Sequence, residues 1–189
     1  SRMRPLTDHM PKALVEVGGK PLVDHVLDRL AEAGVETAVV NVHHFADQME
    51  THLAGRTHPR VEIADERAGL LDSGGGIKNA LHLLGRDPFF VANIDSLWDG
   101  GTTPPLELMK AAWDPARMDM LLLLVPKGQG IGFEGPRGFF IDDDGRITHS
   151  ADDANPAPFA NVGFQIMKPQ LLDDAPDGLF SILPLWWKL

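Results

Sequence analysis

The sequence predicts an α/β fold in which a Rossmann-like, mostly parallel sheet is flanked by helices and joined to a small β-rich part. Segments with helical spacing of apolar residues alternate with short β-branched segments over residues 21–126. Two helical segments end at a glycine, Gly34 and Gly55, shortly before the next apolar run. Beyond Pro126 the pattern changes to glycine-rich turns and short apolar runs, which are typical of hairpins.

The first predicted helix covers residues 21–34, and its apolar residues recur at helical spacing: Leu22, Val23, Val26, Leu27 and Leu30. The β-branched run TAVVNV predicts a strand over 37–42. A second helix is predicted at 45–55. A strand is predicted at 60–66, where apolar and polar residues alternate.

The glycine-rich run DSGGG at 72–76 predicts a tight turn leading into a helix at 77–85. The segment PFFVANID at 88–95 predicts a buried strand that ends in a carboxylate. A helix at 105–115 and a strand at 118–126 follow. Because open α/β sheets bind ligands beyond the carboxyl ends of their strands, the loops at these ends are the candidate binding site.

The remainder of the chain is expected to be richer in β structure. FFIDDDGRITH predicts a hairpin that turns at Asp-Gly. FANVGFQIMKP predicts a strand at 159–169. The apolar tail GLFSILPLWWKL predicts the beginning of a further helix.

Composition excludes several classes of protein. The chain has 189 residues and a formal charge of −10, which argues against a nucleic-acid-binding protein. It contains no cysteine, which excludes disulfides, thiolate zinc sites and cysteine nucleophiles. No apolar run is long enough to span a membrane and no signal peptide opens the chain, so we expect a cytoplasmic protein without a membrane partner. The sequence does not determine the oligomeric state.

Positive charge is concentrated in the opening segment, SRMRPLTDHMPK. Pro5 and Pro11 keep this segment from forming a helix. Arg2, Arg4 and Lys12 are therefore candidates for binding phosphate oxygens during phosphoryl or nucleotidyl transfer. The alternative is that they are ordinary exposed charges.

Two further stretches are candidates for binding. Gly74, Gly75 and Gly76 precede a helix, where backbone N–H groups can approach an anion or a base edge; the alternative is a tight turn capped by Asp72 or Ser73. Asp95 ends a buried strand and is a candidate Mg²⁺ ligand, or alternatively caps the following turn. The histidines show no metal-binding spacing.

The motifs in their order resemble the signature of the sugar-1-phosphate nucleotidyltransferases. RMRPLTDHMPK, followed by GKPL, matches the family pattern R-M-x-P-L-T, three variable residues, P-K and G-K-P-L. The resemblance continues through SGGGI, the N-x-D of Asn93 and Asp95, and NVGF at 161–164. It implies that a nucleoside triphosphate reacts with a sugar 1-phosphate to give an NDP-sugar and pyrophosphate, with Mg²⁺ as cofactor.

The resemblance also implies the roles of individual residues. Arg2 and Lys12 would be the catalytic groups that contact phosphate, and Asp95 would bind magnesium. Contacts with the nucleotide are implied for Arg2, Lys12, Gly74, Gly75, Gly76 and Asn93. Contacts with the sugar are implied for Asn161 and Gly163.

The same resemblance implies a single nucleotidyltransferase domain over 1–189. Its nucleotide-binding half would be 1–126 and its sugar-binding half 127–189. We expect this domain to be incomplete at both ends, because the family pattern places a strand and a glycine turn before Ser1 and a second magnesium-binding aspartate after the last residue.

Within the family, S-G-G-G-I followed by N-I-D-S-L-W most resembles the members that join UTP to N-acetylmuramate 1-phosphate in cell-wall recycling. Transfer of a guanylyl group to mannose 1-phosphate is the alternative. A non-catalytic module that binds sugar nucleotides is an alternative of another class. A dinucleotide-binding oxidoreductase is disfavoured because no G-x-G-x-x-G opens a helix.

Overall fold

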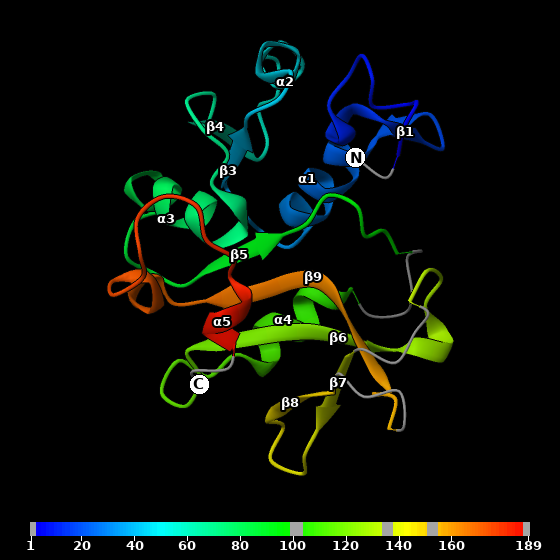
Figure 1. Cartoon of the computed structure of the whole chain (residues 1–189), viewed down its shortest axis with the longest axis vertical. Coiled ribbons are helices and arrows are strands. Elements are labelled where there is room, and N and C mark those ends of the chain that lie inside the picture. Colours follow the sequence, from blue (N-terminus) through cyan, green and yellow to red (C-terminus); the bar gives the residue numbers. More distant parts are fainter. Residues whose placement is uncertain (1–2, 99–103, 134–137, 151–154, 187–189) are drawn as a thin grey trace.

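The structure is a computed structural model that describes all residues except 1–2, 99–103, 134–137, 151–154 and 187–189 (Figure 1). The helices are α1 (Leu22–Glu32), α2 (Ala46–Leu53), α3 (Asp72–Leu84), α4 (Pro105–Ala112) and α5 (Leu183–Trp186), with 3-10 turns η1 (Lys12–Leu14), η2 (Lys127–Gln129) and η3 (Pro169–Leu172). The strands are β1 (Glu16–Val17), β2 (Lys20–Pro21), β3 (Thr37–Val42), β4 (Arg60–Asp65), β5 (Phe89–Ala92), β6 (Met120–Pro126), β7 (Gly138–Ile141), β8 (Ile147–Ser150) and β9 (Phe159–Met167).

The strands form a mixed arrangement. β3 and β4 pair in parallel, from Thr37 opposite Arg60 to Val42 opposite Asp65. A larger sheet has the order β5, β9, β7, β8, and β6 also pairs with β9; all of these pairings are antiparallel. The expected α/β class is confirmed, but among the described residues parallel pairing is confined to β3 and β4, and the larger sheet is antiparallel rather than mostly parallel. The reason is that β9 returns between β5 and β6, so these two strands pair with it and not with each other (Figure 1).

Most predicted elements lie where the sequence places them. The strand predicted at 37–42 is β3, and the predicted Asp-Gly hairpin is β7–β8, with its turn at 142–145. The short hairpin β1–β2 was not predicted; it turns through Gly18 and Gly19, both of which have positive φ. Helix α3 begins at Asp72, five residues before the predicted start, and so contains the three glycines.

The main core lies between α1 and the sheets. Val23, Val26 and Leu27 of α1 are buried in one cluster with Val42 of β3 and Phe164 of β9. Phe164 is completely buried. Burial of a side chain of this kind contributes about 1.5–3 kcal/mol, so this cluster fixes α1 against both sheets.

A second, smaller core joins β9 to the C-terminal segment. Met167 of β9 and Leu172 are fully buried, and Ile182 and Leu185 pack with them. In the part of the chain that the structure describes, no helix has the length and apolar character needed to cross a bilayer.

Candidate active site

Lys12 and Asp95 meet at the carboxyl end of β5. Lys12 opens η1 directly after Pro11, whose extended backbone turns the chain out of the preceding loop. Asp95 lies three residues beyond Ala92, where β5 ends. The Nζ of Lys12 forms an ion pair with Oδ2 of Asp95, and both side chains are partly exposed, at 36% and 43%. The predicted phosphate-binding and metal-binding groups are therefore neighbours, and both can reach a ligand.

The predicted sugar-binding residues lie against Asn93, two positions before Asp95. The backbone N–H of Asn93 donates to the carbonyl of Gly163 at 2.8 Å. The N–H of Gly163 in turn donates to Oδ1 of Asn161 at 2.7 Å. These contacts are possible because β9 shifts register against β6 between Leu122 and Leu124, and Gly163 adopts a φ of +79° there.

Gly163 is at this position for two reasons. Its positive φ disfavours any residue with a Cβ. A Cβ would also lie 2.5 Å from Nδ2 of Asn93, well inside contact distance. The glycine thus lets Asn93, which follows β5, and Asn161 of β9 approach the same point.

The three glycines predicted to bind nucleotide form the buried first turn of α3. The N–H groups of Gly74 and Gly75 donate to the carbonyl of Phe180, at 3.0 and 3.1 Å. A Cβ on Gly75 would lie 2.1 Å from the carbonyl oxygen of Gly178. These two amides are already bonded, because the segment that contains Phe180 packs onto the start of the helix. The sequence left open whether the glycines contact a ligand or form a structural turn.

Residues 173–182, which we call the strap, follow α3 along its length. Lys78 of α3 pairs with Asp177 at 2.8 Å, and Arg86 pairs with Asp173 at 3.2 Å. The N–H of Ile182 donates to Oγ of Ser73 at 3.1 Å. The hydrogen bond from Lys78 lowers the pKa of Asp177 below its ordinary value of 3.8. The strap is thus fixed to both ends of α3.

Arg67, which lies just beyond β4, forms ion pairs with three acidic residues, one at the end of β4 and two on α2. Its guanidinium contacts Asp65 at 2.6 Å, Asp47 at 2.7 Å and Glu50 at 2.9 Å. The hydrogen bonds with Asp65 and Asp47 raise the pKa of Arg67, while those from Arg67 lower the pKa of Asp65. Within the described residues, no cluster of three or more His, Asp or Glu side chains is arranged to hold a metal ion.

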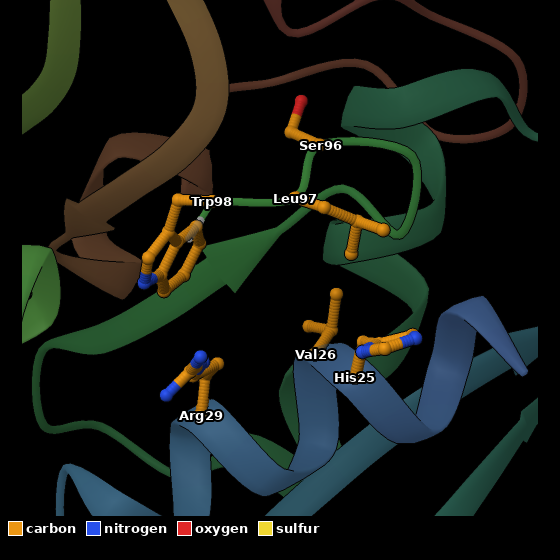
Figure 2. Close-up of a pocket in the computed structure, with 6 residues that line it drawn as sticks. All are labelled: His25, Val26, Arg29, Ser96, Leu97 and Trp98. Atoms are coloured by element: carbon orange, nitrogen blue, oxygen red, sulfur yellow. The ribbon is translucent and has the colours of Figure 1, made fainter. Parts of the chain in front are cut away.

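A small cavity of about 100 Å³ lies between α1 and the residues that follow Asp95 (Figure 2). Its lining comes from His25, Val26 and Arg29 of α1 and from residues 96–98. Arg29 lies 5.9 Å from the centre of the Trp98 ring, and Figure 2 shows these two side chains approaching each other. Trp98 also packs edge-on against Phe164, with ring centres 5.0 Å apart. These contacts hold the loop after Asp95 onto the core.

The residues at this site fit a magnesium ion that a substrate phosphate also binds. Mg²⁺ prefers oxygen ligands and often takes only one or two protein carboxylates, completed by phosphate oxygens and water. Asp95 offers one such carboxylate, part-exposed at a strand end. The Lys12 ammonium beside it is placed to contact phosphate.

The remaining site predictions have different outcomes. Arg2 lies outside the described residues. Arg4 pairs with Asp8 at 3.3 Å and is highly exposed, as its surface-charge alternative predicts. Sequence reasoning did not identify Phe180 or Glu66 as neighbours of the glycine turn, because neither lies in a motif that signals such a contact.

The fold and this site define an α/β domain in which Lys12 of a cationic loop lies beside Asp95, at the end of a strand. Nucleotidyl transfer requires such an arrangement of a cation and a metal-binding carboxylate around the phosphates. The family model described as the MobA-like NTP transferase domain matches residues 1–114, and the chain belongs to this family.

Several known proteins are similar to the chain. It is 51% identical to the N-acetylmuramate alpha-1-phosphate uridylyltransferase of Caulobacter vibrioides, over all of this chain and 79% of that protein. It is 36% identical to the protein of the same name from Neisseria meningitidis, over 94% of this chain and 74% of the other. A more distant relative is the mannose-1-phosphate guanyltransferase of Hypocrea jecorina, at 32% identity over 91% of this chain and 48% of that protein.

Solved structures show the same fold. The inositol-1-phosphate CTP transferase of T. maritima superposes with a TM-score of 0.77 over 99% of this chain and 75% of that one, at 18% identity. The resemblance to nucleotidyltransferases that the motifs indicate is confirmed.

Proposed function

We propose that the chain catalyses transfer of a uridylyl group from UTP to N-acetylmuramate 1-phosphate, which gives UDP-N-acetylmuramate and pyrophosphate. The observation that carries this proposal is the meeting of Lys12 and Asp95, from segments 83 residues apart, at one strand end. The choice of substrates is supported by the two relatives that bear this activity in their names. Guanylyl transfer to mannose 1-phosphate is the second candidate, supported by the more distant guanyltransferase.

The proposed reaction is an in-line displacement. A phosphate oxygen of the sugar 1-phosphate attacks the α-phosphorus of UTP, the bond to the β-phosphate oxygen breaks, and pyrophosphate leaves. Magnesium, held by Asp95 and the phosphates, would supply neutralisation of the developing charge. Lys12 would contact phosphate in the substrate complex, together with Arg2.

We propose that the two halves of the chain bind different substrates. Residues 1–126 would bind the nucleotide and 127–189 the sugar. Asn93 would contact the nucleotide, and Asn161 and Gly163 would contact the sugar; the contact between Asn93 and Gly163 supports a shared border. The amides of Gly74 and Gly75 are bonded to Phe180, so we assign recognition of the base to the exposed segment 69–73. The glycines would instead allow this segment to pack against the rest of the chain.

The cellular role that fits this reaction is recycling of peptidoglycan in the cytoplasm. There the released sugar would be returned to nucleotide-linked form. The named activity of the two relatives supports this setting.

The test is pyrophosphate release from a panel of triphosphates and sugar 1-phosphates with Mg²⁺. The proposal expects the highest kcat/KM with UTP and N-acetylmuramate 1-phosphate. Preference for GTP and mannose 1-phosphate would support the second candidate. Nucleotide binding without pyrophosphate release from any pair would instead indicate a non-catalytic binding module.

A further inference from the structure

Glu66 is a buried carboxylate that the proposed reaction does not use. It follows the last residue of β4 and is 7% exposed. Within the described part of the chain, no lysine, arginine or histidine forms an ion pair with its carboxylate. Burial of a carboxylate costs free energy of desolvation, so a carboxylate buried at this position needs a specific hydrogen-bond partner.

That contact is made through Asn41 of β3. Nδ2 of Asn41 donates to Oε1 of Glu66 at 2.6 Å and to the carbonyl of Gly76 at 3.0 Å. One amide group therefore uses both of its hydrogens to join the end of β4 to the first turn of α3.

The lack of a side chain at position 76 is part of the same arrangement. A Cβ on Gly76 would lie 2.7 Å from Oε1 of Glu66 and 3.3 Å from Nδ2 of Asn41. A larger residue would therefore displace the carboxylate from its partner. Gly76, which the sequence suggested as a ligand contact, leaves room for Glu66.

The backbone of Glu66 holds the other end of the same segment. Its carbonyl accepts the N–H of Gly69 at 3.0 Å and faces Nδ1 of His43 at 2.6 Å. Glu66 thus anchors residues 67–75 at their start directly and at their end through Asn41. Between these anchors lie the exposed residues 69, 70, 72 and 73.

We propose that Glu66 is a positioning residue whose buried carboxylate, through Asn41 and Gly76, fixes the segment 69–73 for contact with the nucleotide base. This inference rests on the proposed function, because it needs that segment to face the nucleotide. Glu66 itself does not touch the substrate. Its side chain has the length needed to place a carboxylate oxygen, the hydrogen-bond acceptor, beside Asn41.

The experiment compares Glu66→Ala and Glu66→Gln in the full chain. Titration calorimetry with UTP and Mg²⁺ should show roughly tenfold weaker binding for Glu66→Ala, the size expected when a buried amide loses its acceptor. Glu66→Gln, which keeps an acceptor oxygen, should bind within about twofold of the wild type. In turnover assays Glu66→Ala should raise the KM for UTP more than it lowers kcat, because Lys12 and Asp95 stay in place.

A second pair of variants covers the case in which Glu66→Ala does not fold. Gly76→Ala should displace the carboxylate and weaken UTP binding, and the shorter side chain of Glu66→Asp in the same protein should recover at least half of that loss. Unchanged UTP affinity in a folded Glu66→Ala protein would overturn the proposal. Equal loss in Glu66→Gln and Glu66→Ala would overturn it too, in favour of a role for the charge.

Hydrogen exchange of the ligand-free protein separates this inference from the proposed function. Peptides covering 67–76 should exchange faster in Glu66→Ala than in the wild type. If the wild type binds no UTP, the proposed function fails while this measurement still tests the anchoring. If the wild type binds UTP and the exchange is unchanged, the positioning role fails alone.

Discussion

The ammonium of Lys12 forms an ion pair with the carboxylate of Asp95, so the proposed metal ligand is already paired with a cation of the protein. In a complex with a metal-bound nucleotide, Lys12 would exchange this carboxylate for phosphate oxygens. The ion pair thus keeps both groups in place while the substrate is absent. It also means that a divalent cation alone must compete with Lys12.

Lys12→Met is therefore expected to have opposite effects on two ligands. In nucleotide-free protein it should tighten binding of Mn²⁺, used as a probe for Mg²⁺, by roughly tenfold, since a positive charge within a few ångströms of the metal is removed. With substrates present it should lower kcat by about 10²-fold or more, as is usual when a preorganised charge contact is lost. Electron paramagnetic resonance of Mn²⁺ and pyrophosphate release measure the two effects. Asp95→Asn is the control and should weaken Mn²⁺ binding; an unchanged Mn²⁺ affinity in Lys12→Met would contradict the competition.

Gly163→Ala should destabilise the fold more than Gly145→Ala does. Both glycines have a φ near +80°, but only at Gly163 would the new Cβ overlap a neighbour, Asn93. We expect the strain common to both to cost about 1 kcal/mol and the overlap at Gly163 to bring its total to about 2–4 kcal/mol. Urea denaturation monitored by tryptophan fluorescence measures both. Equal losses would show that Asn93 gives way without cost.

Gly75→Ala sets two opposing effects against each other. Alanine favours a helix over glycine by about 1 kcal/mol, but the new Cβ would lie 2.1 Å from the carbonyl oxygen of Gly178. Because that atom belongs to the backbone, we expect the overlap to dominate and the net loss of stability to be about 1–3 kcal/mol. Gly55→Ala, at a turn position beyond α2 where no atom lies within 4 Å of the added Cβ, is the control for a glycine-to-alanine change without overlap. In thermal denaturation, a lower Tm for Gly75→Ala than for the wild type would show that the overlap dominates, and a higher Tm would show that helix propensity does.

The pairing of Asp177 with Lys78 predicts a dependence of stability on pH. Lys78 lowers the pKa of Asp177 in the folded protein below the ordinary value of 3.8. The contribution of this pair is therefore present above pH 3.8 and is lost as pH falls through the lower, folded-state pKa. The difference in unfolding free energy between wild type and Lys78→Met should shrink between pH 6 and pH 2. A difference that stays constant over this range would show that the pair does not affect stability.

Local sequence patterns are sufficient to predict a helix or strand when its own residues have a clear periodicity or composition. Strand β3 coincides with the β-branched run at 37–42, which packs against the apolar face of α1. The hairpin β1–β2 was missed because strands of two residues have no periodicity to detect. The start of α3 was misplaced because glycine is a poor helix former, and contacts with Phe180, distant in sequence, compensate for that preference.

Candidate site residues could be predicted where they belong to a sequence motif. Residues whose position depends on tertiary contacts could not be predicted. Lys12, Asn93 and Asp95 followed from the order of the motifs, and the structure brings Lys12 and Asp95 together. The relation of Glu66 to Gly76 depends on how α3 packs over β3 and β4, which no local pattern encodes. The same holds for the Phe180 carbonyl on the glycine amides.

The position of β9 between β5 and β6 has a consequence for synthesis of the protein. During translation, β5 and β6 emerge from the ribosome before the strand that pairs with both of them. A nascent chain that has reached Pro126 holds two apolar strands with no assigned partner among the described residues made so far. Since such long-range pairing is slow to form, the growing polypeptide would need protection from self-association until residues 159–167 have been made.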